Sequence, residues 1–146
     1  MSISLSRRLP ALAMLWLLAL VPLQGLAQKL DLEILRAVIQ VSDNDPQKWN
    51  LALNNARNVQ NDLGAEATEL EIVVYGPGIG MLKADSPVAK RVADALGKGV
   101  KVVACENTMK GQKLTYADML PNIGYVNSGV VELMERQRKH WAYIRP

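Results

Sequence analysis

The residue best suited to chemistry in this chain is its single cysteine, Cys105, at the end of an apolar run over residues 100–105. The thiolate is the nucleophilic form of cysteine, and a thiol with the usual pKa of about 8.5 is only a few per cent thiolate at neutral pH. Lys110, Lys113 or loop amides lying close to the sulfur would lower that pKa and raise the thiolate fraction. We therefore predict that Cys105 is the nucleophile. The alternative left open is that Cys105 is one more small apolar side chain of a buried strand.

One cysteine and one histidine, His140, limit the other chemistry that the chain can do. A disulfide framework and a metal site built from several cysteines or histidines are excluded within one chain. A Cys–His pair would require His140 to reach Cys105, but His140 lies among basic residues near the end of the last predicted helix. Cys105 with Met81 or Met109 as soft-metal ligands has no distinctive spacing. We expect no metal and no cofactor.

A glycine-rich segment, Gly76-Pro77-Gly78-Ile79-Gly80, follows a second apolar run over residues 70–75. It is not a dinucleotide fingerprint, because Lys83 stands where the third glycine would be, and the P-loop pattern is also absent. Its amides could hold a small anion. Equally, the glycines could serve a tight turn that needs positive φ angles. The candidate binding residues around the thiol are Gly76, Gly78, Gly80, Asn107, Lys110 and Lys113.

Strands and helices alternate along the chain after residue 33. Apolar, β-branched runs predict strands over 34–41, 70–75, 100–105 and 123–126. Helical spacing and capping residues predict helices over 46–63, from 86 to 97, over 115–120 and from 127 or 128 to about 141, with a loop over 106–114. Such alternation predicts one α/β domain, a flavodoxin-like parallel sheet with helices on both faces.

In open α/β sheets, binding sites lie beyond the carboxyl ends of the strands. Three segments follow predicted strands in this chain: residues 42–45, the glycine segment 76–80, and the loop that begins after Cys105. We therefore expect these three segments to converge on one site.

Residues 1–27 have the features of an export signal. Arg7 and Arg8 precede an uninterrupted apolar stretch over 11–21, and Gly25-Leu26-Ala27 presents small residues for cleavage near Ala27-Gln28. The apolar stretch is shorter than the roughly 20 residues that span a bilayer. We expect a mature domain of residues 28–146 in the periplasm, without a membrane anchor after cleavage.

The composition fits a folded domain, with 49% hydrophobic and 21% charged residues. The 17 Lys and Arg exceed the 14 Asp and Glu by a net charge of +3. Two of these basic residues lie in the predicted signal, so the mature domain has a net charge of only +1. The remaining basic residues are dispersed and not interleaved with aromatic ones, so we expect no nucleic-acid partner.

Several segments resemble the DsrE/DsrF-like sulfur-handling family, in particular its short exported members. They are residues 38–42 (VIQVS), 73–78 (VVYGPG), 102–109 (VVACENTM), 129–135 (GVVELME) and 141–146 (WAYIRP). The resemblance extends over residues 33–146. It implies a compact flavodoxin-like fold that assembles as trimers or hexamers. It also implies that Cys105 accepts sulfane sulfur as a persulfide and passes it to a partner protein.

Two hypotheses follow. In the first, the protein is a periplasmic sulfur carrier or sulfurtransferase-like protein with Cys105 as acceptor; whether it turns over as an enzyme stays open. In the second, it is a non-enzymatic oligomeric module that binds a small anion or a protein partner, with Cys105 buried. The apolar tail over 141–144 predicts an oligomer interface, unless it packs back onto its own sheet.

Overall fold

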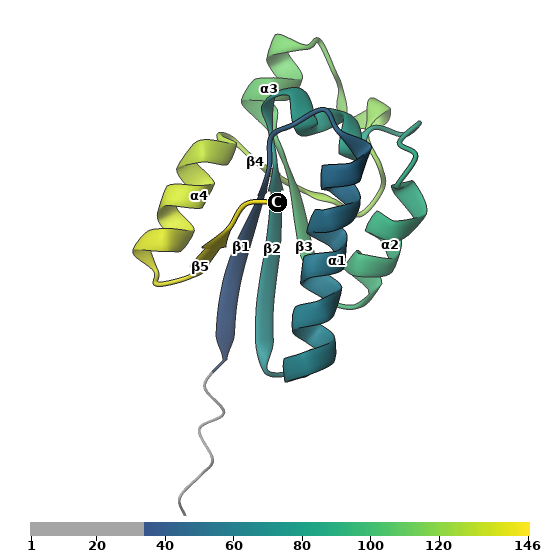
Figure 1. The fold of residues 1–146 in the computed structure, drawn as a ribbon. Helices are drawn as coiled ribbons and strands as arrows, with labels where there is room; N and C mark the ends of the chain where they lie inside the picture. Colours follow the sequence, from purple (N-terminus) through teal and green to yellow (C-terminus); the bar gives the residue numbers. More distant parts are fainter. Residues whose placement is uncertain (1–33) are drawn as a thin grey trace, which may run out of the picture. The chain divides into compact units, whose positions relative to one another are not determined.

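The computed structural model describes residues 34–146 (Figure 1), so the predicted signal over 1–27 lies outside the described residues. The strands are β1 (Leu35–Val41), β2 (Thr68–Val74), β3 (Lys101–Cys105), β4 (Gly124–Val126) and β5 (Ala142–Ile144). The α-helices are α1 (Pro46–Leu63), α2 (Ala89–Gly97), α3 (Glu106–Gly111) and α4 (Gly129–Arg138). Two 3₁₀ helices, η1 (Gly76–Leu82) and η2 (Tyr116–Asp118), complete the order. Within this part of the chain, no helix is long and apolar enough to cross a membrane.

The strands form one parallel sheet in the order β4-β3-β2-β1-β5. This confirms the predicted α/β class with a parallel sheet and helices on both faces. Flavodoxin-like sheets commonly have the order 2-1-3-4-5, so the same layering is built here with a different order. β1 and β2 pair along their whole length, from Leu35 opposite Thr68 to Val41 opposite Val74.

The helices divide between the two faces of the sheet (Figure 1). α1 and α2 cover one face, where they pack on alternate strand residues such as Ile39 and Ile72. α4 covers the other face, where Val38 and Val73 pack with Leu133. Side chains of a strand alternate between faces, and both faces of the central strands are covered. The long apolar strands are therefore those of a buried parallel sheet.

The boundaries of α1 follow from local chemistry and match the predicted helix. Asp45 caps it by accepting a hydrogen bond of 2.8 Å from the Gln47 amide, and Pro46 occupies the first turn. Gly64 ends it with a φ of +88°. Trp49, on its buried face, donates its indole N–H to the Asp43 carbonyl at 2.7 Å. The turn between β1 and α1 is thereby fixed against the core.

Four predicted elements differ from the structure. The helix expected from 86 begins only at Ala89, and the helix expected over 115–120 is the short 3₁₀ turn Tyr116–Asp118. The segment after Cys105 was expected to be a loop, but Glu106–Gly111 forms the short helix α3. The last helix was expected to reach about residue 141, but it ends at Arg138.

The tail after α4 packs back onto its own sheet. His140 has a φ of +62°, which turns the chain, and residues 142–144 pair with β1 as the edge strand β5. Trp141 is buried, with its ring 4.6 Å from the Arg136 guanidinium. Because this apolar tail packs within its own sheet, it no longer indicates an oligomer interface, although Tyr143 is still exposed.

Candidate functional site

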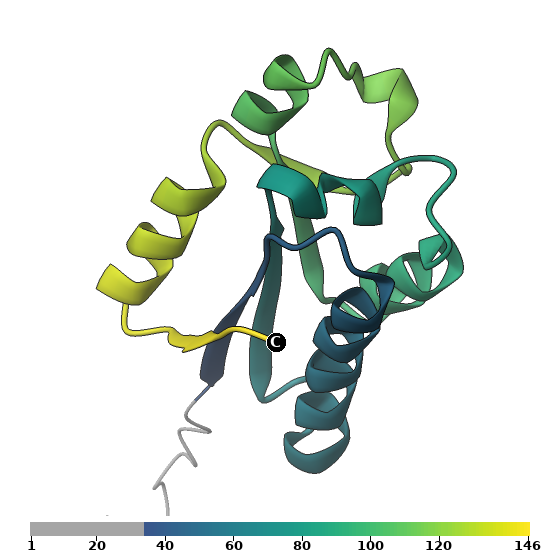
Figure 2. The same ribbon diagram turned by 45° about the horizontal axis from the view of Figure 1, so that its top comes forward.

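The three segments expected to converge do meet at the carboxyl edge of the sheet. The Gly78 amide donates to the Ser42 carbonyl at 3.1 Å, and the Gly76 amide donates to the Thr108 hydroxyl at 2.9 Å. In Figure 2, which brings this edge forward, η1 and α3 lie above the ends of the central strands. The end of β4 joins them, because the Asn107 amide donates to the Asn127 carbonyl at 3.1 Å.

Cys105 lies at the centre of this edge. It is the last residue of β3 and immediately precedes α3. Its side chain shares a sheet face with Val103, on the side that α4 covers. The thiol donates to the Asn127 carbonyl at 3.9 Å, and the residue is only 4% exposed. The nucleophile is thus placed at the predicted edge but beneath the surface of the isolated chain.

Two opposing influences act on the pKa of the Cys105 thiol. Burial, the largest of them, raises the pKa. Hydrogen bonds from the Thr108 hydroxyl and from the amides of Gly129, Thr108 and Asn107 lower it, and together they outweigh burial, so the pKa lies below its ordinary value. None of these contacts has the geometry of a short capping hydrogen bond, so their effect comes from number rather than from one strong bond.

The arrangement follows from the position of Cys105 at the start of α3. A residue that precedes a helix points its side chain at the amides two and three residues ahead, which here are those of Asn107 and Thr108. The Asn107 amide also donates to the Asn127 carbonyl, so the Thr108 amide is the free one of the two. The start of α4 supplies the Gly129 amide from another segment. Several backbone donors therefore face one sulfur atom, which favours the anionic form.

Thr108 connects the glycine segment to the sulfur. Its hydroxyl oxygen accepts the hydrogen bond from the Gly76 amide. A hydroxyl has one hydrogen to donate, and with its oxygen occupied by Gly76 that hydrogen is left for Cys105, whose pKa the Thr108 hydroxyl lowers. The turn after β2 thereby fixes the orientation of a donor to the thiol.

The two predicted lysines do not act on the sulfur. Lys110 and Lys113 are exposed, and neither is among the groups that shift the pKa of Cys105. Lys110 lines a hollow of about 310 Å³ between α3 and η2 together with Glu106, whose carboxylate accepts a hydrogen bond from the Tyr116 hydroxyl. Hydrogen bonds, not nearby lysine charges, lower this pKa.

The predicted glycines serve packing and turning. Gly76 has a φ of +56°. A Cβ atom at Gly78 would lie 2.8 Å from the Val41 carbonyl oxygen, and one at Gly80 would lie 3.2 Å from the Trp49 ring. Of the three, only Gly76 contacts the thiol site, through Thr108. The interpretation of this segment as an anion cradle is therefore not needed to explain its glycines.

His140 is too far away for a Cys–His pair. It follows the carboxyl end of α4, whereas Cys105 lies at the amino end beside Gly129. The ten residues of α4 separate the two by roughly 15 Å at 1.5 Å per residue. Over residues 34–146, no cluster of three or more His, Cys, Asp and Glu side chains is placed to hold a metal ion.

Asn107 is predicted from the sequence as part of the site, but Thr108, Asn127 and Gly129, which also contact Cys105, are not. The sequence offers one way to find Thr108, because its hydroxyl lies one helical turn after a cysteine that begins a helix. The sequence offers no way to find Asn127 and Gly129, because their approach to Cys105 depends on the pairing of β3 with β4.

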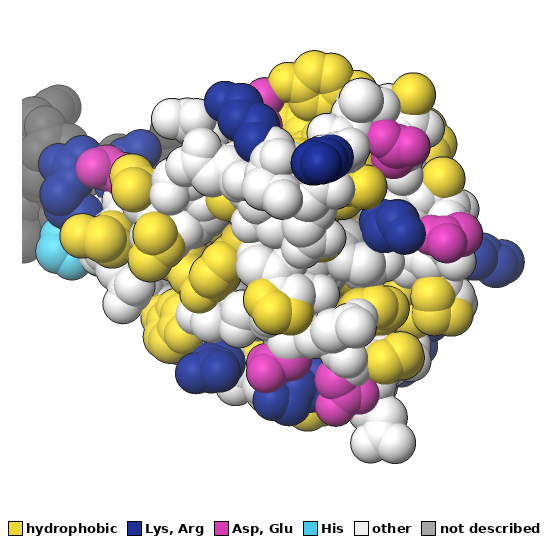
Figure 3. Space-filling model, turned by 90° about the horizontal axis from the view of Figure 1, so that it is seen from above, with side chains coloured by type: hydrophobic (Ala, Val, Ile, Leu, Met, Phe, Trp, Pro, Cys, Tyr) yellow, Lys and Arg dark blue, Asp and Glu magenta, His cyan; other side chains and the backbone are white. Residues whose placement is uncertain are grey.

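The surface over this edge is mixed in character. Figure 3 views the molecule from above, and positive, negative and apolar side chains are interspersed on this face. Asn107 and Asn127 are exposed here, so polar groups flank the buried thiol.

The fold and the site define a small α/β protein with a parallel sheet and one thiol at the carboxyl edge, held by the starts of two helices. The sequence profile of the DsrE/DsrF-like family matches residues 36–146, so the chain belongs to this family. A profile of the PRAME N-terminal domain matches residues 2–64, which would end after α1 and separate β1 from its sheet partners. No curated protein matches the sequence.

Solved structures are similar over the same region. MTH1491, a protein of unknown function from Methanobacterium thermoautotrophicum, is 35% identical, with a TM-score of 0.73 over 77% of this chain and 99% of its own. BT1422 from Bacteroides thetaiotaomicron is 14% identical, with a TM-score of 0.63 over 76% and 94%. The ychN protein from E. coli is 12% identical, with a TM-score of 0.59 over 77% and 100%. The last two share the fold.

Proposed function

We propose that this protein accepts sulfane sulfur on Cys105 and carries it as a persulfide. The observation that carries the proposal is the convergence of the Thr108 hydroxyl and the amides of Thr108 and Gly129 on the sulfur of Cys105, which lowers the pKa of that thiol despite burial. A buried cysteine with only a packing role needs no such donors. Membership of a sulfur-handling family supports the same chemistry.

The reaction balances with thiosulfate as donor. The Cys105 thiol loses its proton to water, and the thiolate attacks the sulfane sulfur. A sulfur–sulfur bond forms to Cys105, the bond between the sulfane sulfur and the sulfonate sulfur breaks, and sulfite leaves with the electron pair. With a polysulfide donor, a shorter polysulfide or hydrosulfide leaves instead. In both cases the product is a Cys105 persulfide anion, and the same amides would stabilise its charge.

The burial of Cys105 places a condition on this function. The side chain is 4% exposed, so a donor reaches the sulfur only when the segment over it moves. The segment from Asn127 to Gly129 covers the thiol and has an exposed asparagine. We propose that this segment opens to admit the donor.

The same burial favours a second candidate function, a binding module in which the thiol never reacts. The two functions differ in one measurable property, the reactivity of Cys105 in the folded protein. A module with an inert cysteine is labelled by thiol reagents only after denaturation.

The site of action and the assembly of the protein are also proposals. Residues 1–27 support export to the periplasm. A homo-oligomer is supported by the outer side of α4, where Val130, Val131 and Met134 are all more than half exposed. That apolar surface lies beside Gly129, so an assembled partner or a sulfur donor or acceptor protein seated there would border the thiol.

The decisive experiment uses protein purified after expression of the full-length gene. The protein is incubated with thiosulfate or polysulfide and its intact mass is measured, with Cys105→Ser as the matched variant. We expect the wild type to gain one sulfur atom and the variant to gain none. Iodoacetamide labelling of the native and the denatured protein is run in parallel. An unchanged wild-type mass, with labelling only after denaturation, would establish the binding module instead.

A further inference from the structure

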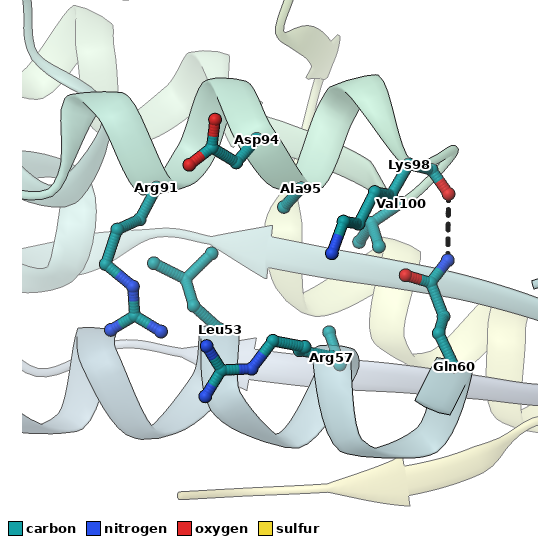
Figure 4. Close-up of a pocket in the computed structure, with 9 residues that line it drawn as sticks. Leu53, Arg57, Gln60, Arg91, Asp94, Ala95, Lys98 and Val100 are labelled. Carbon is teal, nitrogen blue, oxygen red and sulfur yellow. Dashed lines mark hydrogen bonds between the residues drawn. The ribbon is translucent and has the colours of Figure 1, made fainter. Parts of the chain in front are cut away.

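A second polar hollow lies on the other side of the sheet, between α1 and α2. It has a volume of about 120 Å³. Figure 4 shows Arg57 and Gln60 reaching into it from α1, Arg91 from α2, and Lys98 from just beyond the end of α2. The Gln60 amide donates to the Lys98 carbonyl at 2.9 Å, which closes one end. Two helices and the residue that follows α2 thus direct three positive side chains toward one small space.

These three positive charges have no carboxylate partner among residues 34–146. The ion pairs of this part of the chain involve other basic residues, and none includes Arg57, Arg91 or Lys98. The one acid that lines the hollow, Asp94, pairs with Lys90 at 2.9 Å. The space between α1 and α2 therefore has a local excess of positive charge.

Neutral side chains hold the two guanidinium groups in place. Asn54 accepts a hydrogen bond of 2.7 Å from Arg91 and another of 3.0 Å from Arg57 through the same amide oxygen. Arg91 also donates to the Asn50 amide oxygen. One uncharged acceptor thus keeps two like charges close together. A guanidinium has five N–H donors, so each arginine still has donors for a ligand.

The size of the hollow indicates the class of ligand. A volume of about 120 Å³ is well above the roughly 10–15 Å³ that one water needs. It is well below the roughly 300 Å³ at which pockets for drug-sized ligands and cofactors begin. Planar guanidinium groups recognise tetrahedral and planar oxyanions through paired hydrogen bonds. We infer that the hollow between α1 and α2 binds a small tetrahedral oxyanion, of the class of sulfate, thiosulfate and phosphate.

This site is separate from the thiol. Lys98 lies just before β3, and Cys105 is the last residue of that strand. The length of β3, about 13 Å at roughly 3.3 Å per residue, separates them along the sheet, and α1 and α2 cover the face opposite α4. An oxyanion held by Arg57 and Arg91 is therefore out of reach of the sulfur, and the inference does not depend on the function of Cys105.

A competing explanation is that the arginines only bridge the two helices through Asn54. The two explanations differ for Arg57, which is exposed and whose removal leaves the bonds from Arg91 to Asn54 and Asn50 intact. Arg57→Gln should therefore fold normally. Lys110→Gln, which removes one exposed positive charge beside α3, is the matched control.

The test is a titration followed by amide NMR spectra, with sodium sulfate, thiosulfate and phosphate added separately and sodium chloride added at equal ionic strength. We expect saturable shifts around Arg57, Arg91 and Lys98 with the oxyanions and none with chloride. Arg57→Gln should weaken binding about tenfold, as expected for loss of one charge-assisted hydrogen bond, and Lys110→Gln should leave it unchanged. Shifts that do not saturate, or an equal loss in both variants, would show that the arginines only bridge the helices and would overturn the inference.

Discussion

A buried carboxyl group outside the thiol site makes the stability of this protein depend on pH. Glu71 on β2 is 1% exposed and faces α4, where the Arg136 guanidinium lies 2.6 Å from one of its oxygens. Burial raises the pKa of Glu71, Arg136 lowers it, and the neighbouring Glu132 raises it again. The balance is a pKa raised from 4.5 to about 7. The folded protein therefore holds a proton on Glu71 at a pH where the unfolded chain has lost it.

The sign and size of the effect follow from this difference. Because the folded pKa of Glu71 is the higher one, its stabilising contribution is complete below about pH 4.5 and is lost as the pH rises to about 7. The gap between 4.5 and about 7 corresponds to about 3 kcal/mol of unfolding free energy. Well above pH 7 Glu71 is ionised in both the folded and the unfolded state, so the unfolding free energy no longer changes with pH through this group. Glu71→Gln carries no charge at any pH, so it should abolish this loss.

Urea denaturation at a series of pH values between 5 and 8 measures the effect. Glu69→Gln is the control, since Glu69 lies on the same strand but is only partly buried and pairs with Arg36. We expect the unfolding free energy of the wild type and of Glu69→Gln to fall over this range, and that of Glu71→Gln to change much less. If Glu71→Gln keeps the full slope, another group is responsible. If the wild type has no slope, Arg136 keeps Glu71 ionised throughout and the reasoning is refuted.

Three further predictions concern packing and the thiol site. Gly78→Ala should destabilise the fold by about 2 kcal/mol or more, because its Cβ would press on the backbone of β1. Gly97→Ala has open space around it and should be neutral or stabilising by up to about 1 kcal/mol. Thermal unfolding of the two variants measures the difference. Gly129→Ala should shift the start of α4, because its Cβ would lie 2.9 Å from that of Tyr75. This shift should raise the pKa of the Cys105 thiol, which iodoacetamide alkylation against pH measures. An unchanged alkylation profile counts against the role of the Gly129 amide. Thr108→Val should also raise the pKa of the thiol while Thr108→Ser preserves it, and equal profiles for the two would remove the hydroxyl from the site.

The parts of the fold that the sequence predicts are those governed by local rules. The cap at Asp45, the proline after it and the glycine at 64 define α1 through chemistry within a few residues, so its predicted bounds coincide with the observed ones. The apolar strands are recognisable because both faces of a central parallel strand are buried. β5 was missed because its three residues become a strand only by pairing with β1, more than 90 residues earlier.

One part of the thiol site can likewise be predicted from the sequence, and another part cannot. Cys105 at the end of a strand, and the convergence of three turns there, follow from the general geometry of parallel sheets. The donors to the sulfur do not, since Gly129 arrives from another segment and Thr108 acts through a helix that was expected to be a loop. The lysines were assigned instead because charge is visible in a sequence, whereas the direction of a backbone amide is not.

The two polar centres of this protein use different physical means, and they should therefore be separable. The thiol depends on oriented, uncharged donors that act over contact distance. The hollow between α1 and α2 depends on full charges, but these lie on the opposite sheet face, about a strand length away. That separation of about 13 Å exceeds the Debye length of about 8 Å at physiological salt. Arg57→Gln should thus leave the alkylation profile of Cys105 unchanged, and Thr108→Val should leave oxyanion binding unchanged. A shared response would mean that the sheet couples its two faces.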